Sequence, residues 1–209
     1  MNHSTITAEQ QEAVAATLSV MPNIPAGVGS KENACSIAAI NLALSGKLTD
    51  VIPDCMSVVT GRWIIKIQDY APAELRNSER WRRLLPLAAG TGRDREAERS
   101  SVALEWMWSV VLPQVQPIAD RLGFGEKWHD MCSLRTASCA ANAAKAASAA
   151  NAAAASCAAS CAANASNAAS KAANAAANAA AAADADFWHS VDPCGCLERM
   201  INLPEGDGK

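Results

Sequence analysis

The chain has 209 residues, of which 50% are apolar, and its formal net charge is −3 at pH 7. This length fits one domain, or a small domain with an extension, and the charge gives no case for nucleic-acid binding, which needs a surplus of lysine and arginine. Because the N-terminus lacks the pattern of a secretory signal and polar residues interrupt the long alanine-rich stretch, we expect a cytoplasmic protein without a membrane partner.

Helix signals recur along the chain, whereas the alternating pattern of β-strands is absent. Thr7 and Gln10 have the spacing of a capping box, which opens a short first helix. Prolines and glycines over residues 22–29 then predict a loop. Ser30 is the expected N-cap of the next helix, and Gly46 is its expected end. The N-terminal part of the chain therefore predicts two helices joined by a loop.

The middle of the chain predicts three more helices. Residues 54–69 favour a helix with Asp54 as its N-cap, although their many β-branched side chains leave a strand as the alternative. Asn77 or Ser78 can cap the following helix, in which Pro86 is expected to end or kink the backbone. A fifth helix is expected over residues 93–112, where apolar and tryptophan side chains recur at helical spacing.

The remaining helices are short, apart from an alanine-rich stretch. Proline and glycine residues predict a helix over 117–122 and a new helix start near Gly125. Near the other end, Asp192 can cap a final helix that has Pro193 in its first turn, a position where proline costs no hydrogen bond. The chain is therefore expected to be helical on both sides of the alanine-rich stretch.

Residues 137–185 contain 31 alanines among 49 residues and neither glycine nor proline. Alanine is the best helix former, so this segment predicts a helix. Its polar residues step by three or four, which places them on one stripe of that helix. The segment either projects as a rod or folds back on itself. We predict a fold-back with a break near Asn151 or within residues 164–167, because Asn tolerates the left-handed conformation of a helix end. The stripe residues are Ser156, Ser160, Asn164, Asn167, Lys171, Asn174 and Asn178.

These elements predict an all-α fold, made of a compact helical bundle and a long alanine-rich helix or helical hairpin. Changes in composition divide the chain into four parts. They are an N-terminal helix and loop over 1–29, a helical bundle module over 30–135, the alanine-rich segment over 136–186, and a short helix with a tail over 187–209.

Residues 84–99, LLPLAAGTGRDREAER, place a Gly-Thr-Gly turn before a predicted helix and surround it with arginines. Such a turn and the positive end of a helix can bind phosphate or another anion. The pattern is not a P-loop, and pairing of Asp94, Glu96 and Glu98 with the arginines in an ordinary interhelical turn is the alternative. The predicted anion-binding residues, including a tryptophan on which a base could stack, are Gly90, Thr91, Gly92, Arg93, Arg95, Arg80 and Trp81.

The sequence predicts no metal site, no cofactor and no catalytic residue. His129 and Cys132 share a helix face, and His189 precedes Cys194 and Cys196, but no CxxC pair supports metal binding. A GxSxG motif is absent, and only three histidines are present. The eight cysteines are scattered along the chain, so we expect reduced thiols.

Four segments, NACSIAAINLALSGKLTD, GRWIIKIQD, LLPLAAGTGRDREAER and DPCGCLERMI, together resemble a family of uncharacterised bacteriophage and prophage proteins. The resemblance covers most of the chain. It implies a compact helical module, similar to residues 30–135, followed by an alanine-rich run of variable length and a short terminal helix. In this chain the run carries Asn, Ser and Cys where the family pattern has more Asp and aromatic residues. The resemblance implies no established activity.

These observations favour a non-enzymatic binding protein, such as a phage accessory or counter-defence factor. Its partner would be a host defence protein or an anionic nucleotide signal. One alternative is a structural protein that forms homo-oligomers through the alanine-rich segment; an ice-binding variant of this idea is disfavoured because a threonine array is missing. Another alternative is an enzyme with an unfamiliar site, for which Asp69, Arg62 and His129 are the candidates.

Overall fold

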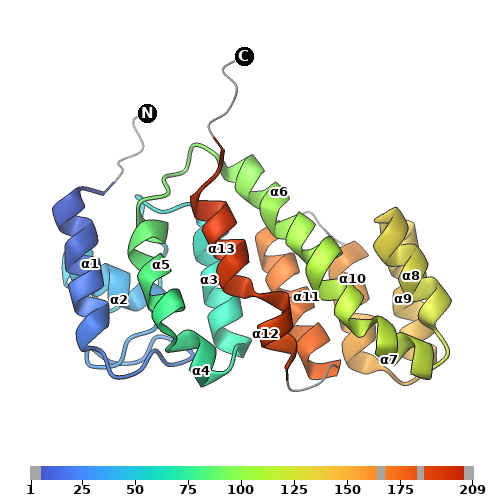
Figure 1. Ribbon diagram of the computed structural model, residues 1–209. Helices are drawn as coiled ribbons and strands as arrows, with labels where there is room; N and C mark the ends of the chain where they lie inside the picture. The colour runs from blue at the N-terminus through green and yellow to red at the C-terminus, as the bar shows by residue number, and fades with distance from the viewer. Residues whose placement is uncertain (1–5, 164–167, 183–185, 205–209) are drawn as a thin grey trace, which may run out of the picture. The chain divides into compact units, whose positions relative to one another are not determined.

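Residues 6–163, 168–182 and 186–204 are described by the computed structural model. These residues form helices and loops, and the single β-bridge among them, between Gly29 and Ala34, is isolated. The predicted all-α class is therefore confirmed (Figure 1). The chain forms two compact units, unit 1 from residues 1–102 and 193–209 and unit 2 from residues 103–192. The predicted bundle module over 30–135 contributes to both units.

Unit 1 combines the N-terminal half of the chain with its last helix. The helices α1, α2 and α5 contact one another, and α13 contacts both α3 and α5. The helices of this unit are α1 (Ala8–Val20), α2 (Ser36–Ser45), α3 (Val58–Tyr70), α4 (Ala73–Arg76), α5 (Glu79–Ala89), the first part of α6 (Glu96–Trp106) and α13 (Pro193–Ile201).

Unit 2 begins within α6 and continues without a break in helical winding. It contains a π-helical turn, Met107–Val111, and a 3₁₀ turn, Leu112–Val115. The helices that follow are α7 (Gln116–Arg121), α8 (Gly125–Leu134), α9 (Ala137–Ala149), α10 (Ala153–Ala163), α11 (Ala168–Ala182) and α12 (Phe187–Val191).

Several predicted helix ends are confirmed. The capping box of α1 is present: the Thr7 N–H donates to Gln10 Oε1 at 2.9 Å, and the Gln10 N–H donates to Thr7 Oγ1 at 3.2 Å. Gly46 ends α2 with a left-handed φ of 70°. Ser78, one of the two predicted caps, accepts the Trp81 N–H at the start of α5. Local sequence patterns therefore determine these boundaries.

The predicted start of α2 was wrong. The helix begins at Ser36, and the Cys35 sulfur accepts the first capping hydrogen bond. Ser30 lies in a turn instead, where its hydroxyl donates to Glu32 at 2.8 Å and accepts the Asn33 N–H at 3.3 Å. The bridge between residues 29 and 34 closes this turn and holds it out of the helix.

Two further predictions in unit 1 need correction. Ser57, rather than Asp54, is the N-cap of α3, and its side chain accepts the Thr60 N–H at 3.1 Å. Pro86 lies inside α5, which continues to Ala89 instead of ending there. The proline removes one backbone donor, but it is buried together with the preceding Leu84 and Leu85, so packing keeps the segment helical.

The core of unit 1 contains a pair of tryptophans. Trp63 of α3 and Trp81 of α5 are fully buried, with ring centroids 6.3 Å apart. The Trp81 indole N–H donates to the hydroxyl of Ser36 at 3.1 Å. This bond satisfies the polar end of the ring inside the apolar core. The tryptophan pair therefore joins α3 and α5 to the first turn of α2.

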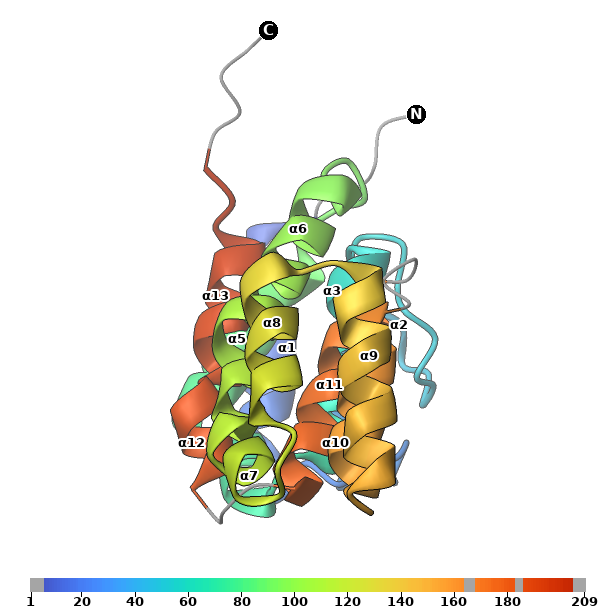
Figure 2. The ribbon, with the colours of Figure 1, turned by 90° about the vertical axis from the view of Figure 1, so that its right-hand side faces the viewer.

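The alanine-rich segment of unit 2 is broken into separate helices, and α10 contacts both α9 and α11 (Figure 2). The break predicted near Asn151 is confirmed, because this residue follows α9 with a left-handed φ of 57°. A rod over the whole segment is therefore wrong, and the alternative break over 164–167 lies outside the described residues. The Ser156 hydroxyl donates to Ala144 O at 2.9 Å, which links α10 to α9.

Candidate functional site

The Gly-Thr-Gly loop joins α5 to α6 and is held by the segment before α3. Thr91 Oγ1 donates to Ala88 O at 2.7 Å and accepts the N–H of Ser57 at 3.0 Å. The Gly92 N–H donates to Cys55 O at 2.8 Å, from a left-handed φ of 62° that glycine adopts without strain. The backbone donor of Gly92 and the hydroxyl of Thr91 are therefore used within the protein.

A carboxylate from the same chain occupies the N-terminus of α3. Glu96 accepts the Ser57 hydroxyl at 2.9 Å, the Val58 N–H at 2.7 Å and the Val59 N–H at 2.9 Å. The first N–H groups of a helix have no partner within the helix and attract negative charge. Glu96 thus satisfies these donors in the way that a bound anion would, and it fixes the start of α6 to the start of α3.

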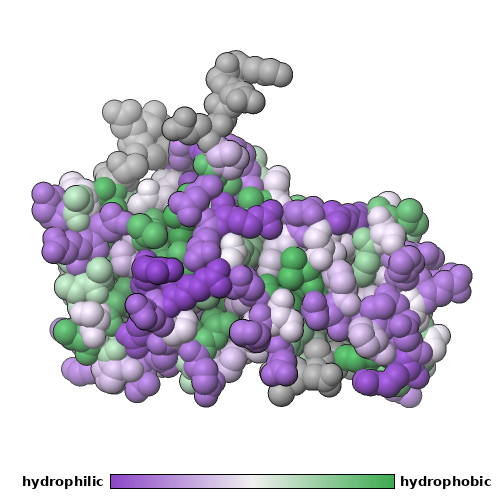
Figure 3. Space-filling view, in the orientation of Figure 1, coloured by the Kyte–Doolittle hydropathy of each residue, from purple (hydrophilic) through white to green (hydrophobic). Residues whose placement is uncertain are grey.

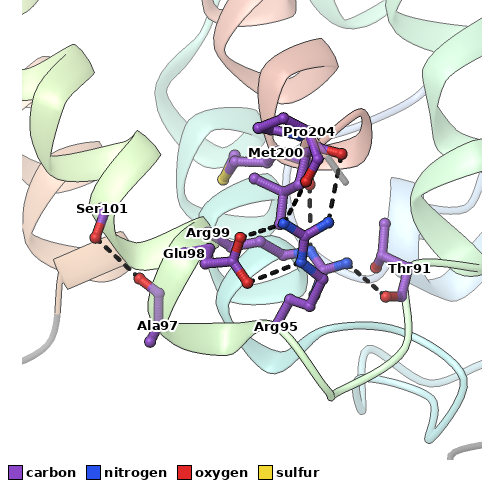
Figure 4. A network of polar contacts seen from close by, with 9 residues as sticks. Thr91, Arg95, Ala97, Glu98, Arg99, Ser101, Met200 and Pro204 are labelled. Carbon is purple, nitrogen blue, oxygen red and sulfur yellow. Dashed lines mark hydrogen bonds and ion pairs between the residues drawn. The ribbon is translucent and has the colours of Figure 1, made fainter. Parts of the chain in front are cut away.

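Arg95 in the loop and Arg99 in the first turns of α6 bind carbonyls of the last turn of α13 and of the residues that follow it (Figure 4). Arg99 is 4% exposed and donates to Thr91 O at 2.6 Å and to Met200 O at 3.2 Å. Arg95 donates to Leu203 O at 3.3 Å and to Pro204 O at 2.6 Å, and it pairs with Glu98. Burial lowers the pKa of the Arg99 guanidinium. These arginines bind backbone carbonyls at the end of a helix, where the helix dipole favours a cation.

The other arginines predicted to bind an anion also pair within unit 1. Arg93 forms an ion pair with Asp54 at 2.9 Å. Arg80 on α5 donates to both carboxylate oxygens of Glu198 on α13, at 3.0 and 2.8 Å. This hydrogen bonding lowers the pKa of Glu198. Of the pairs that the alternative expected with Asp94, Glu96 and Glu98, the described residues form the one between Arg95 and Glu98, whereas Glu96 binds the start of α3 instead.

The predicted anion-binding residues do not form a single exposed site. Residues 90–92, Arg93 and Arg95 meet in the loop, whereas Arg80 and Trp81 lie on α5. Trp81 is fully buried, so it has no exposed ring face and the expectation of base stacking there is corrected. Anion binding by the loop stays a prediction, but its main donors already have acceptors inside the protein.

Sequence reasoning missed a common role of arginine in this unit, which is to bind carbonyls where helices end. Arg76 donates to Gln68 O at 3.2 Å and to Ala71 O at 3.1 Å, at the end of α3. Arg82 donates to Leu18 O at 2.6 Å and to Met21 O at 2.9 Å, at the end of α1. The contacts of Arg82 join residues more than 60 positions apart in the sequence, so no local pattern could reveal them.

A groove of about 690 Å³ lies between α1 and α5. In the space-filling view, hydrophilic residues gather over α5 and α13 (Figure 3). Leu18 and Pro86, both buried, belong to the lining. The groove is lined by Ala8, Gln11, Glu12, Ala15, Leu18, Ser19, Asn77, Glu79, Arg82, Arg83 and Pro86.

Three charged residues of this groove are exposed: Glu12 on α1, and Glu79 and Arg83 on α5. None of them forms a hydrogen bond or an ion pair with the described part of the chain. Arg82 differs, because carbonyls at the end of α1 take its guanidinium. The groove therefore offers two carboxylates and one guanidinium that no hydrogen bond or ion pair holds, although the charge of Arg83 also contributes to lowering the pKa of Glu198.

The candidates for catalysis are divided between the two units. Arg62 and Asp69 are exposed on α3 of unit 1, and Asp69 accepts a long hydrogen bond of 3.4 Å from the Gly27 N–H. His129 is exposed on α8 of unit 2, 3.3 Å from the Ser133 hydroxyl. Among the described residues, no group of three or more His, Cys, Asp or Glu side chains has an arrangement that could hold a metal ion.

Comparison of the chain with protein-family models, with curated proteins and with solved structures found no match. None of the described helices combines the length and the hydrophobicity needed to cross a membrane. Within the described part of the chain, the cysteines form no disulfide bond. The groove and the loop are therefore the features of the molecule that bear on its function.

Proposed function

We propose that the protein is a non-enzymatic binding protein and that the groove between α1 and α5 receives its partner. The observation that carries this proposal is the set of three exposed charges, Glu12, Glu79 and Arg83, that form no hydrogen bond or ion pair with the described part of the chain. The groove volume of about 690 Å³ also falls within the range of known binding sites. The arginine-rich loop is less suited to this role, because its arginines bind groups of the protein itself.

The charges in the groove favour a protein partner over an anionic nucleotide. Two carboxylates would repel a phosphate group, and Arg83 is the one guanidinium of the lining that is not already bound to backbone carbonyls. A protein surface can present both signs of charge and so match all three residues. The resemblance to phage proteins supports a host protein as that partner.

The test is capture of a partner from host lysate by the tagged full chain. Ala15→Trp places an indole in the groove, and Ala13→Trp, at an exposed position of α1 outside the lining, is the matched control. We expect wild type and Ala13→Trp to capture the same protein in similar amounts. Ala15→Trp should capture at least about tenfold less of it, because a filled groove excludes the partner. Equal capture by all three proteins, or no specific capture, overturns the proposal.

Thermal-shift measurements with cyclic and ADP-ribose-type nucleotides test the nucleotide alternative. We expect no shift. A shift that disappears in Arg83→Ala would assign the groove to a nucleotide instead. A rise in melting temperature that disappears when Arg93 or Arg95 is replaced would instead show that the loop binds the anion. Oligomerisation through the alanine-rich segment stays a separate prediction, which sedimentation at several concentrations checks.

A further inference from the structure

Resting on the proposed function, we infer that the groove between α1 and α5 takes an α-helix of the partner protein, with charges in the order basic, acidic, basic along one face. The lining residues of α1 recur at helical spacing from Ala8 to Ser19. Eleven steps of about 1.5 Å give a groove about 16 Å long, which matches three turns of a helix. Ala8, Ala15 and Ser19 are small, so a helix can approach this wall closely.

The other common ways of binding a peptide do not fit this groove. Addition of a β-strand needs an open sheet edge, and the described residues contain no sheet. Binding of a polyproline helix needs an aromatic-lined groove, whereas the lining contains no aromatic residue. Recognition of a phosphorylated motif needs a cluster of free arginines, and here two carboxylates flank one free guanidinium. A helix lying between two helices is the mode that remains.

The order of charges along the groove follows from how α1 and α5 run. Arg82 near the start of α5 contacts Leu18 O near the end of α1, and Gly90 at the end of α5 faces Ile6 before the start of α1. The two helices are therefore antiparallel. Glu12 lies midway between residues 6 and 18 of α1 and the segment before it. It is therefore level with the middle of residues 82–90, about one helical turn beyond Arg83 toward the C-terminal end of α5.

The groove consequently presents an acidic, a basic and an acidic side chain in succession: Glu79, then Arg83 one turn further along α5, then Glu12 from the opposite wall. Residues four apart on a helix lie about 5–6 Å from each other, so each step matches one turn of a bound helix. A partner helix with a basic, an acidic and a basic residue at successive turns meets each charge with its opposite. Because this order is symmetric, it fits in either direction.

Three synthetic peptides test the inference against the full chain by fluorescence anisotropy. The first is an alanine- and leucine-faced helix of 18 residues with Lys, Glu and Lys at successive turns. The second has Glu, Lys and Glu at the same positions, and the third repeats the first with a central proline that breaks the helix. We expect the first peptide to bind at least about tenfold more tightly than either of the others.

Protein variants make the outcome specific to the groove. We expect the triple variant Glu12→Lys, Glu79→Lys, Arg83→Glu to prefer the second peptide, and Arg62→Glu, at an exposed position of α3, to leave the preference unchanged. Absence of binding, equal binding of all three peptides, or binding that survives Ala15→Trp overturns the helix inference. Capture of a lysate protein that Ala15→Trp abolishes would still leave the proposed function standing, so the two failures are distinguishable.

Discussion

Unit 1 and unit 2 hold their helices together in different ways. In unit 1, long arginine side chains such as Arg76, Arg82 and Arg99 reach backbone carbonyls at the ends of α3, α1 and α13. In unit 2, the described part of the alanine-rich helices packs through methyl groups, and alanines such as Ala143 and Ala159 are fully buried. Arginine contacts at helix ends thus add to the apolar core of unit 1, whereas the alanine-rich helices of unit 2 depend on close contact along their faces.

Because their contacts differ, the two units are sensitive to different kinds of substitution. An arginine that satisfies several buried carbonyls is hard to replace, because its loss leaves those acceptors without donors. An alanine face has few polar contacts to lose but no room for a larger side chain. Each alanine also buries little area, so larger residues must supply much of the apolar burial in unit 2. Trp106 and Trp128 do so, and their indole N–H groups donate to Val191 O and Leu112 O.

The largest effect is expected from Arg99→Ala in unit 1. Loss of the guanidinium leaves the carbonyls of Thr91 and Met200 without these donors in a buried site, which costs about 3 kcal/mol of the free energy of unfolding. Urea denaturation measures the loss, and hydrogen exchange should place it in unit 1. Arg62→Ala, at an exposed position, is the control and should change stability by less than about 0.5 kcal/mol. Equal effects of the two substitutions would contradict the role given to Arg99.

The next largest effect is expected from overpacking unit 2. Ala159→Leu adds three carbons at a fully buried position of α10 and should cost about 2 kcal/mol. Ala153→Leu, at an exposed position of the same helix, should be close to neutral. Hydrogen exchange should show lost protection in α9 to α11 for the first variant alone. If Ala159→Leu were as stable as wild type, close packing of this helix would be disproved.

A smaller effect is expected at the turn after α9. Asn151 has a left-handed φ of 57°, which costs alanine about 1 kcal/mol more than it costs glycine. Asn151→Ala should therefore lower the midpoint of urea denaturation, and Asn151→Gly should match or exceed wild type. Two variants of equal stability would show that the backbone at this turn does not need the left-handed conformation.

The smallest effect concerns the ion pair between α5 and α13. The Arg80 guanidinium lowers the pKa of Glu198 below its ordinary value of 4.5, so the pair stabilises the folded state above that pH and loses its contribution as the pH falls through the folded-state pKa. Both side chains are partly exposed, so Glu198→Gln should cost about 0.5 kcal/mol at pH 7. The difference in the free energy of unfolding between wild type and Glu198→Gln should become smaller as the pH falls below 4.5. If urea denaturation gave a constant difference down to pH 3, this role of the ion pair would be refuted.

The sequence predicted the parts of the fold that depend on neighbouring residues. The capping box at Thr7, the glycine end of α2 at Gly46 and the break at Asn151 were confirmed, because each depends on a few adjacent positions. The start of α2 was missed because an isolated bridge holds the preceding turn. Pro86 was expected to end or kink α5, and the first of these alternatives was wrong, because the helix continues to Ala89 with the proline buried.

The candidate site was predicted less well, for a physical reason. The sequence shows that arginines surround residues 90–92, but it does not show which acceptors the arginines reach. Their partners, such as Met200 and Glu198, lie more than 100 residues further along the chain. The groove between α1 and α5 depends in the same way on long-range packing, so Arg83 could not be separated by sequence alone from arginines that serve the fold.

The division of unit 1 between two distant stretches of the chain has a consequence for its synthesis. A ribosome releases residues 1–102 well before the segment that forms α13, whereas residues 103–192 emerge as one continuous piece. Unit 2 can therefore complete its contacts first. Until residues 193–204 emerge, the guanidinium of Arg99 lacks its carbonyl acceptor at Met200. Unit 1 therefore cannot complete its folding before that segment has been synthesised.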